Sequence, residues 1–223
     1  VRRHEPAGRR ILPVLAAQAV GRKPRRLSLT RAERAEIVMR RLYEAAVTVV
    51  GEHGYAGATV SRITALAQVA QGTFYNYFPN RQDLLDQLLR TLGQDMLLFI
   101  REKVHGVDDQ VELERARFRA FFDFLIETPQ FMRILYEAQL YAPAGYDRHM
   151  QNVSRNYIRT LQKGGLGEQF TEEELKVVTT VMMGARSYLS YAFAYDGDKV
   201  SLPSEAVFSA YDKLMRHGLF NVG

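Results

Sequence analysis

Residues 59–78 read TVSRITALAQVAQGTFYNYF and carry the strongest structural signal in the chain. Thr59 can cap a first helix, because its hydroxyl can accept a backbone N–H that has no partner inside the helix. Four apolar residues recur at helical spacing and are predicted to form the buried face of this helix: Val60, Ile63, Leu66 and Ala67. A turn at Gln68 and Val69 then leads into a second helix from Gln71 to Tyr77. The pattern predicts two short helices joined by a tight turn.

The second helix is predicted to have an aromatic inner face and a polar outer face. Phe74 and Phe78 are four residues apart, so they share the face that packs inward. The remaining side chains point outward and are rich in amide, hydroxyl and phenol groups. Such a pair forms a helix-turn-helix when the first helix braces the DNA backbone and the second enters the major groove. We therefore expect this segment to bind duplex DNA.

The segment resembles the DNA-binding half of the tetracycline-repressor (TetR) family over about residues 34–92. The residues that carry the resemblance are Gly54-Tyr55, Thr59, Gly72-Thr73-Phe74-Tyr75-Asn76-Tyr77-Phe78, Pro79-Asn80-Arg81 and Leu84-Leu85. The chain departs from the family pattern at Gln68, where Gly is common, and at Gln71, where Lys or Arg is common. The resemblance implies an all-α fold, with an N-terminal three-helix DNA-binding domain and a C-terminal helical domain for ligand binding and dimerisation.

Charge is distributed unevenly along the 223 residues. Residues 1–90 hold 15 Lys and Arg against 7 Asp and Glu, a net charge of +8, whereas residues 91–223 hold 15 against 18, a net charge of −3. Because phosphate contacts supply most non-specific affinity for DNA, the basic half suits a nucleic-acid partner. We predict a basic arm over residues 1–29, a DNA-binding domain over 30–92, and an effector-binding and dimerisation domain over 93–223.

The basic arm has several interpretations. Its apolar run from Ile11 to Val20 resembles a secretory signal, but Pro13 interrupts it, basic residues follow at once, and ten residues cannot span a bilayer. Arms of this kind can place arginines in the minor groove beside the main contact. The candidates are Arg22, Lys23, Arg25 and Arg26. A disordered, solvated tail is the alternative.

Predicted DNA contacts divide into those that position the protein and those that read bases. Tyr77, Arg81 and Thr59 suit phosphate. Gln and Asn can pair with adenine, and a Thr methyl suits a thymine methyl. The base-reading candidates are Gln71, Thr73 and Asn76, and either role suits Arg62 and Tyr75. Each of these side chains would otherwise be an ordinary solvated surface group.

Helical signals recur over the rest of the chain, and strand signals are scarce. Thr30 with Glu33 and Thr171 with Glu174 match the capping box that opens a helix. Predicted helices span about residues 30–53, 81–105, 146–163, 171–195 and 204–217. Another helix, marked by Phe118 to Leu125, stops near Thr128, and a further one begins there. The helix over 171–195 is apolar around most of its girth, so it needs burial on two sides.

A second subunit is the expected cover for one of those sides. The resemblance implies a homodimer whose interface is a four-helix arrangement, here built from residues 172–195 and 204–217. A buried central helix in a monomer is the alternative.

The resemblance also implies a small-molecule effector in the C-terminal domain, coupled to the DNA-binding domain through residues 81–105. We predict an apolar or aromatic effector bearing a few hydroxyls or an acid group. The candidate lining residues are Phe118, Phe122, Phe131, Met132, Tyr136, Asn152, Asn156, Met182, Arg186 and Tyr188. Each of the apolar ones could instead be ordinary core.

Other function classes find little support. The five histidines are scattered without metal-ligand spacing, no Gly-rich phosphate loop follows a strand, and cysteine is absent. We therefore expect no enzyme activity, metal or cofactor, no membrane partner, and a cytoplasmic location. The predicted function is a repressor that binds an inverted-repeat operator and is released by its effector. An architectural DNA-binding protein without an effector is the alternative.

Overall fold

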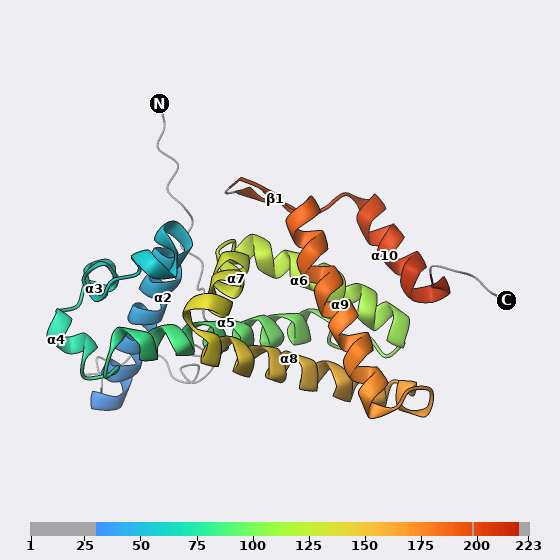
Figure 1. Cartoon of the computed structure of the whole chain (residues 1–223), viewed down its shortest axis with the longest axis horizontal. Coiled ribbons are helices and arrows are strands. Elements are labelled where there is room, and N and C mark those ends of the chain that lie inside the picture. Colours follow the sequence, from blue (N-terminus) through green and yellow to red (C-terminus); the bar gives the residue numbers. More distant parts are fainter. Residues whose placement is uncertain (1–29, 198, 219–223) are drawn as a thin grey trace, which may run out of the picture.

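The computed structural model describes residues 30–197 and 199–218, and these residues form nine α-helices and one short hairpin (Figure 1). The N-terminal head contains α2 (Arg31–Gly57), α3 (Val60–Ala67) and α4 (Gln71–Phe74). α5 (Arg81–Lys103) leaves the head and runs alongside α8, below α6 and α7 in the view of Figure 1. The four candidate arm residues, Arg22, Lys23, Arg25 and Arg26, lie outside the described residues.

The C-terminal part is also helical, which confirms the predicted all-α class. Its helices are α6 (Gln110–Glu127), α7 (Phe131–Tyr141), α8 (Pro143–Lys163), α9 (Glu172–Phe193) and α10 (Glu205–His217), with a 3-10 turn at Leu166–Glu168. Between α9 and α10 the strands β1 (Tyr195–Asp196) and β2 (Lys199–Val200) pair antiparallel, a hairpin that the sequence did not predict. Within the two described ranges, no helix is both long enough and apolar enough to cross a membrane.

The two predicted capping boxes open α2 and α9. The Glu33 N–H donates to the Thr30 hydroxyl over 3.2 Å, and the Thr30 N–H donates to the Glu33 carboxylate over 2.7 Å. Thr171 and Glu174 repeat this arrangement at 3.3 and 2.7 Å. These bonds satisfy N–H groups that have no partner inside the helix. Both helix starts could therefore be predicted from a few neighbouring residues.

Gly54 ends the regular part of α2, as predicted. Its φ of +69° lies in the left-handed region, which a residue with a Cβ adopts only with strain. A Cβ at this position would also lie 2.7 Å from a carboxylate oxygen of Glu137 on α7. That carboxylate accepts the next N–H of α2, from Tyr55, over 2.7 Å. The glycine therefore lets α7 dock directly against the end of α2.

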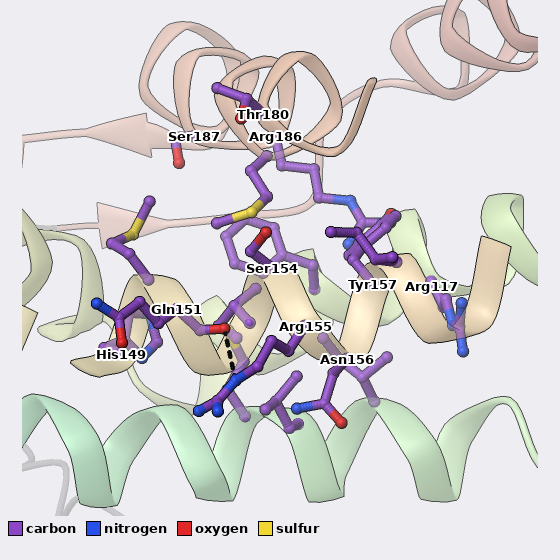
Figure 2. A pocket seen from close by; sticks show the side chains of 18 of the residues that line it. Arg117, His149, Gln151, Ser154, Arg155, Asn156, Tyr157, Thr180, Arg186 and Ser187 are labelled. Carbon is purple, nitrogen blue, oxygen red and sulfur yellow. Dashed lines mark hydrogen bonds between the residues drawn. The ribbon is translucent and has the colours of Figure 1, made fainter. Parts of the chain in front are cut away.

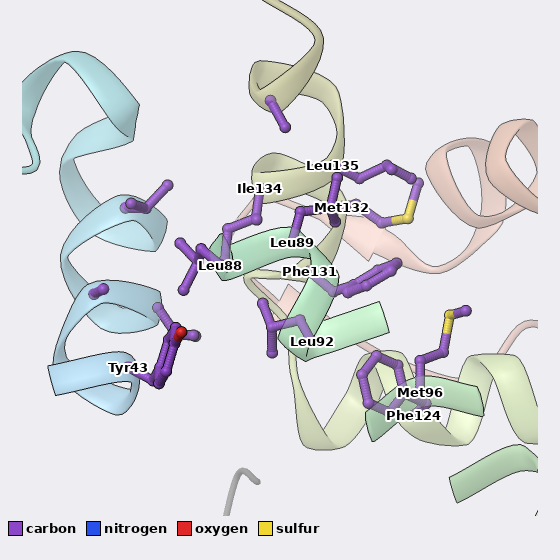
Figure 3. Close-up of a cluster of buried hydrophobic side chains, with 14 of the residues drawn as sticks. Tyr43, Leu88, Leu89, Leu92, Met96, Phe124, Phe131, Met132, Ile134 and Leu135 are labelled. Carbon is purple, nitrogen blue, oxygen red and sulfur yellow. The ribbon is translucent and has the colours of Figure 1, made fainter. Parts of the chain in front are cut away.

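α5 forms the centre of one continuous apolar core that joins the head to the C-terminal helices (Figure 3). Its predicted apolar face is confirmed, since all six residues are at most 5% exposed: Leu84, Leu85, Leu88, Leu89, Leu92 and Met96. Figure 3 shows Leu88 between α2 and α7, with Phe131 of α7 farther along α5. Because α5 packs on both the N-terminal head and the C-terminal helices, a shift of α5 would also displace residues of the head.

Three local predictions were wrong. Leu66 is 50% exposed, and Thr64 is buried instead because its hydroxyl donates to the Val60 carbonyl over 2.8 Å. α4 ends at Phe74, and the residues up to Tyr77 form a turn. α8 begins three residues early at Pro143, since proline is favoured at a first helical position, where no N–H is needed.

Candidate functional site

α4 is held in place by aromatic packing on its inner side. Phe74 and Phe78 are at most 1% exposed, and their ring centroids lie 5.4 Å apart. The Tyr43 ring from α2 meets Phe78 edge to face at 5.7 Å. This packing confirms the predicted inner face and fixes which side of α4 points outward.

The predicted contact residues on and after α4 all keep accessible side chains. Gln71, Tyr75 and Asn76 are exposed, and Thr73 and Tyr77 are half-buried. The Tyr75 ring is 57% exposed although it is large and partly apolar. This surface offers amide, hydroxyl and phenol groups next to one another.

Gly72 has no steric role within the described chain. A Cβ added there would meet no atom within 4 Å, and the residue is exposed within a helix. Glycine costs up to about 1 kcal/mol relative to alanine in a helix, so packing within the chain does not explain it.

Thr59 and Arg62 define the start of α3. The Thr59 hydroxyl accepts the Arg62 N–H over 3.3 Å, which confirms the predicted cap. The Arg62 guanidinium donates to the Gly57 carbonyl over 2.8 Å while the side chain stays exposed. Both residues therefore stabilise the head and remain accessible to a phosphate or a base.

The turn between α3 and α4 closes without glycine. Gln68 adopts φ +56° and ψ 44°, and its N–H donates to the Thr64 and Ala65 carbonyls. For a residue with a Cβ this left-handed conformation costs about 1–2 kcal/mol. The departure from the family pattern at this position is therefore accommodated as local strain.

Gln68→Gly should relieve part of that strain. Glycine visits this region freely but loses more backbone entropy on folding, so we expect a net gain of about 0.5–1 kcal/mol in the free energy of unfolding. Urea unfolding at one protein concentration measures the gain. The same substitution at the helical, exposed Ala65 should instead destabilise the protein. Equal losses at both positions would contradict the assignment of strain to Gln68.

Arg81 is engaged inside the head. Its half-buried guanidinium donates through Nε to the Ala58 carbonyl over 2.6 Å and through Nη2 to the Tyr55 carbonyl. These carbonyls follow the end of regular α2, and that of Tyr55 also accepts the Ala58 N–H over 3.3 Å. Arg81 thus braces the start of α5 against the link between α2 and α3. A phosphate contact by the same side chain stays a prediction.

A cavity of about 1230 Å³ lies among α5, α6, α7, α8 and α9 (Figure 2). Its apolar wall is formed by Met96, Leu97, Ile100, Val104, Phe121, Phe131, Leu135, Val153 and Met183. A mostly apolar wall with a few polar groups is typical of small-molecule sites.

About half of the predicted lining residues reach this cavity. Those that line it are Phe131, Tyr136, Asn156, Arg186 and Tyr188. The others, which lie outside its lining, are Phe118, Phe122, Met132, Asn152 and Met182. Phe118 and Phe122 are fully buried, because Phe118 stacks on Tyr211 at 3.7 Å and both pack against Phe208. They hold α10 on α6 rather than surround a ligand.

A second cavity between α2, α7 and α9 is lined by Met132, Tyr136, Tyr188, Tyr191 and Tyr195. The Tyr136 and Tyr191 rings meet edge to face at 5.7 Å. Its wall also contains exposed side chains of α9, so the end of that helix is open in the single chain.

His149 is a cavity residue that the sequence did not identify. Its side chain is 4% exposed, and burial lowers the pKa of the imidazole to about 4. The ring is therefore neutral at physiological pH and meets the Phe131 ring at 6.1 Å. A neutral imidazole among apolar groups can bond a ligand oxygen without adding charge.

Arg186 belongs to a buried polar cluster at one end of the cavity, and its three partners were also missed. Its Nη2 lies 2.6 Å from Oε1 of Glu114, which also accepts the Tyr211 hydroxyl over 2.7 Å. The other Glu114 oxygen accepts the Tyr157 hydroxyl over 2.6 Å. Burial alone lowers the pKa of the Arg186 guanidinium, but Tyr157 and Glu114 outweigh it and hold that pKa above its ordinary value. The cluster ties α6, α8, α9 and α10 together.

α9 presents an apolar face to solvent. Its large exposed residues are Val177, Val181, Tyr188, Tyr191 and Phe193, each at least 54% exposed. Gly184 lies on the same helix, and a Cβ there would meet nothing within 4 Å. α9 is therefore buried on one side only, which departs from the nearly complete burial that its composition demands.

Known proteins resemble both parts of the chain. The family described as "Bacterial regulatory proteins, tetR family" matches residues 42–88. The fatty acid metabolism regulator protein of Bacillus subtilis (strain 168) is 44% identical over 54 residues, which cover 24% of this chain and 28% of that protein. The transcriptional repressor DhaR of Mycobacterium sp. (strain GP1) is 34% identical over 91 residues, 41% of this chain and 44% of that protein. The chain thus matches less than half the length of these curated relatives.

A solved structure extends the likeness to most of the fold. The regulator FadR from Bacillus subtilis in complex with stearoyl-CoA superposes with a TM-score of 0.62 at 21% identity, over 81% of this chain and 98% of that chain. The matched segment contains α3, α4 and the polar surface around Gly72. Residues 42–88 therefore match the DNA-binding segment that the tetR family model describes, and the helical fold over most of the chain is similar to that of a solved regulator.

Proposed function

We propose that the protein is a homodimeric repressor that binds an inverted-repeat operator and leaves it when an apolar effector enters the cavity. Residues 30–92 would bind DNA, and residues 93–223 would dimerise and bind the effector. The observation that carries the proposal is the surface of α4. Its polar side chains are accessible, its inner face is locked by Phe74 and Phe78, and Gly72 leaves its backbone open to close approach.

The contacts are assigned by chemistry. Thr59, Tyr77 and Arg81 would position the head on phosphates, and Gln71, Thr73 and Asn76 would read base edges. Arg62 and Tyr75 suit either role. With two-fold symmetry, two copies of this surface would meet half-sites about one helical turn, or a multiple of it, apart.

The exposed face of α9 supports the homodimer. Val177, Val181 and Tyr188 leave a row of apolar side chains in water, and a second α9 would cover it. α10 lies beside α9 in Figure 1 and adds the exposed Leu214. Sedimentation should give twice the mass of one chain, and Val181→Arg should give monomers because it places like charges opposite each other across the two-fold axis.

An elongated apolar effector suits the cavity. The wall formed by α5 and α7 is largely aliphatic and aromatic. Since the similar B. subtilis regulator was solved with stearoyl-CoA, we propose a fatty acyl compound as the effector class.

α7 offers a route from the cavity to the head. Phe131 and Tyr136 on this helix line the cavity, while Arg133 donates to the Gly51 carbonyl of α2 over 2.8 Å. Glu137, one turn farther on, accepts the Tyr55 N–H at the end of α2. A ligand that displaces α7 must therefore move or break these contacts. Release of DNA follows if the ligand-bound arrangement holds the two heads at the wrong spacing.

Selection of bound sequences from random duplexes tests the proposal directly. The expected result is an inverted repeat, and fluorescence anisotropy on that duplex should show release by stearoyl-CoA. Equal affinity for all duplexes and no effect of the acyl compound would favour an architectural protein instead.

Gly72→Ala should separate DNA binding from folding. Alanine favours the helix, so the melting temperature should hold or rise. Operator affinity should fall about tenfold, equivalent to about 1.4 kcal/mol, because the methyl group keeps the duplex away from the α4 backbone. Anisotropy titrations at one salt concentration measure the loss, and thermal melting is the control. Unchanged affinity would remove Gly72 from the interface.

A further inference from the structure

The cavity has more positive than negative charge at the end where α6, α8 and α9 meet. Arg186 of α9 and Arg117 of α6 both line this end, close to Tyr157 of α8 (Figure 2). Glu114 is the carboxylate that pairs with Arg186 there. Two guanidinium groups thus share a single carboxylate.

That carboxylate is already fully engaged. One oxygen of Glu114 accepts from Arg186 and Tyr211, and the other accepts from Tyr157. Glu114 is 9% exposed, so water has little access to its carboxylate. Glu114 pairs directly with Arg186 and acts on Arg117 only from a longer distance.

Arg117 has a neutral partner. Its Nη2 donates to the Thr160 hydroxyl over 3.2 Å, and no carboxylate of the described residues lies within 4.0 Å of its nitrogens. Burial lowers the pKa of this half-buried guanidinium, and the opposing effects of Tyr157 and Glu114 offset this only in part. Partly desolvated cations of this kind gain most from an added anion.

Arg186 supplies a second free donor. The side chain is 7% exposed, and its Nε is buried without a hydrogen-bond partner. Nη2 of this guanidinium is bonded to Glu114, so Nε is a donor that remains available. An unsatisfied buried N–H on a cavity wall is costly unless a ligand bonds it.

We propose that this end of the cavity binds the carboxylate of an amphiphilic acid, held by Nε of Arg186 and by Arg117, which the Thr160 hydroxyl positions. The apolar part of the ligand extends towards Phe131 and Leu135. The assignment rests on the effector role of the cavity proposed above, and it adds which chemical group of the ligand is recognised and where.

The rim of the cavity offers a competing site. Arg101, Arg155 and Arg159 also line it, but all three are exposed. Water and salt screen exposed charges, so they attract anions weakly and without fixed geometry. Arg159→Gln is therefore a matched control, since this substitution removes one positive charge from the same cavity.

Calorimetric titration of the full chain with dodecanoate and dodecan-1-ol tests the subsite without DNA. Wild type should bind the acid at least about tenfold more tightly than the alcohol, as expected for a charge-assisted pair. Arg117→Gln should abolish this preference while keeping alcohol binding, and Thr160→Val should reduce it. Arg159→Gln should preserve it. Thermal melting confirms that each variant is folded.

Three results would overturn the subsite: no acid preference in wild type, a preference that survives Arg117→Gln, or a preference lost in Arg159→Gln instead. Operator release by the same ligands is measured separately. If the acid preference depends on Arg117 but neither ligand releases DNA, the subsite stands and the effector role of the cavity fails.

Discussion

Arg186→Met is expected to lower the free energy of unfolding by about 3–5 kcal/mol, the usual cost of breaking a buried ion pair from one side. Methionine fills much of the volume of arginine, so lost packing contributes little. The loss comes from Glu114, whose carboxylate stays at 9% exposure with only the hydroxyls of Tyr157 and Tyr211 as donors. Urea unfolding at a fixed protein concentration measures the change.

Two variants test this explanation. Arg216→Met removes an exposed arginine that bridges Glu112 and Asp212, and it should change stability little. Glu114→Gln added to Arg186→Met should restore part of the loss, because glutamine still accepts from a tyrosine without a buried charge. A loss of less than about 1 kcal/mol in Arg186→Met would show that the cluster is solvated.

Arg81→Ala is expected to cost about 2–4 kcal/mol, since hydrogen bonds to charged groups contribute about 1.5–3 kcal/mol each and these two share one guanidinium. The variant removes the side-chain donor of the Ala58 carbonyl and leaves the Tyr55 carbonyl with the Ala58 N–H alone, at the point where α5 meets the link between α2 and α3. The head should therefore loosen first, and hydrogen exchange should increase in α3 before it increases in α9.

Arg81→Lys separates the brace from a phosphate contact. Lysine keeps the charge but lacks the planar guanidinium that reaches two carbonyls. The free energy of unfolding of Arg81→Lys should therefore fall nearly as much as that of Arg81→Ala. If Arg81 also binds phosphate, the salt dependence of operator binding should drop by about one unit in Arg81→Ala and be preserved in Arg81→Lys. Full stability of Arg81→Lys would exclude the brace.

The helix-turn-helix could be predicted because its signals are local. Thr59 caps α3, Phe74 and Phe78 pack inward, and Gly54 stops α2, each within a few residues of where the pattern placed it. Leu66 marks the limit of such reasoning. Its apolar character favoured burial, but the direction of its side chain depends on the orientation in which α3 packs against α2.

The cavity was predicted less well because it joins segments far apart in the chain. Phe118 and Phe122 have the composition of a ligand pocket, yet α10 packs on them. His149 and Arg117 carry no signal in the sequence, where they are single polar residues on amphipathic helices. Rotation by one residue decides whether Met182 or Met183 of α9 faces the cavity, and periodicity does not resolve so small a difference.

The sequence alone determined the helical class, most helix starts, and the polar outer face of α4, since capping and periodicity act over three to four residues. Only the tertiary structure decided that Glu114 is shared by Arg186, Tyr157 and Tyr211, residues 43 to 97 positions away. It also decided that Arg117 has no carboxylate partner among the described residues. Such pairings depend on the angles and offsets at which whole helices pack, and those follow from the sum of all core contacts.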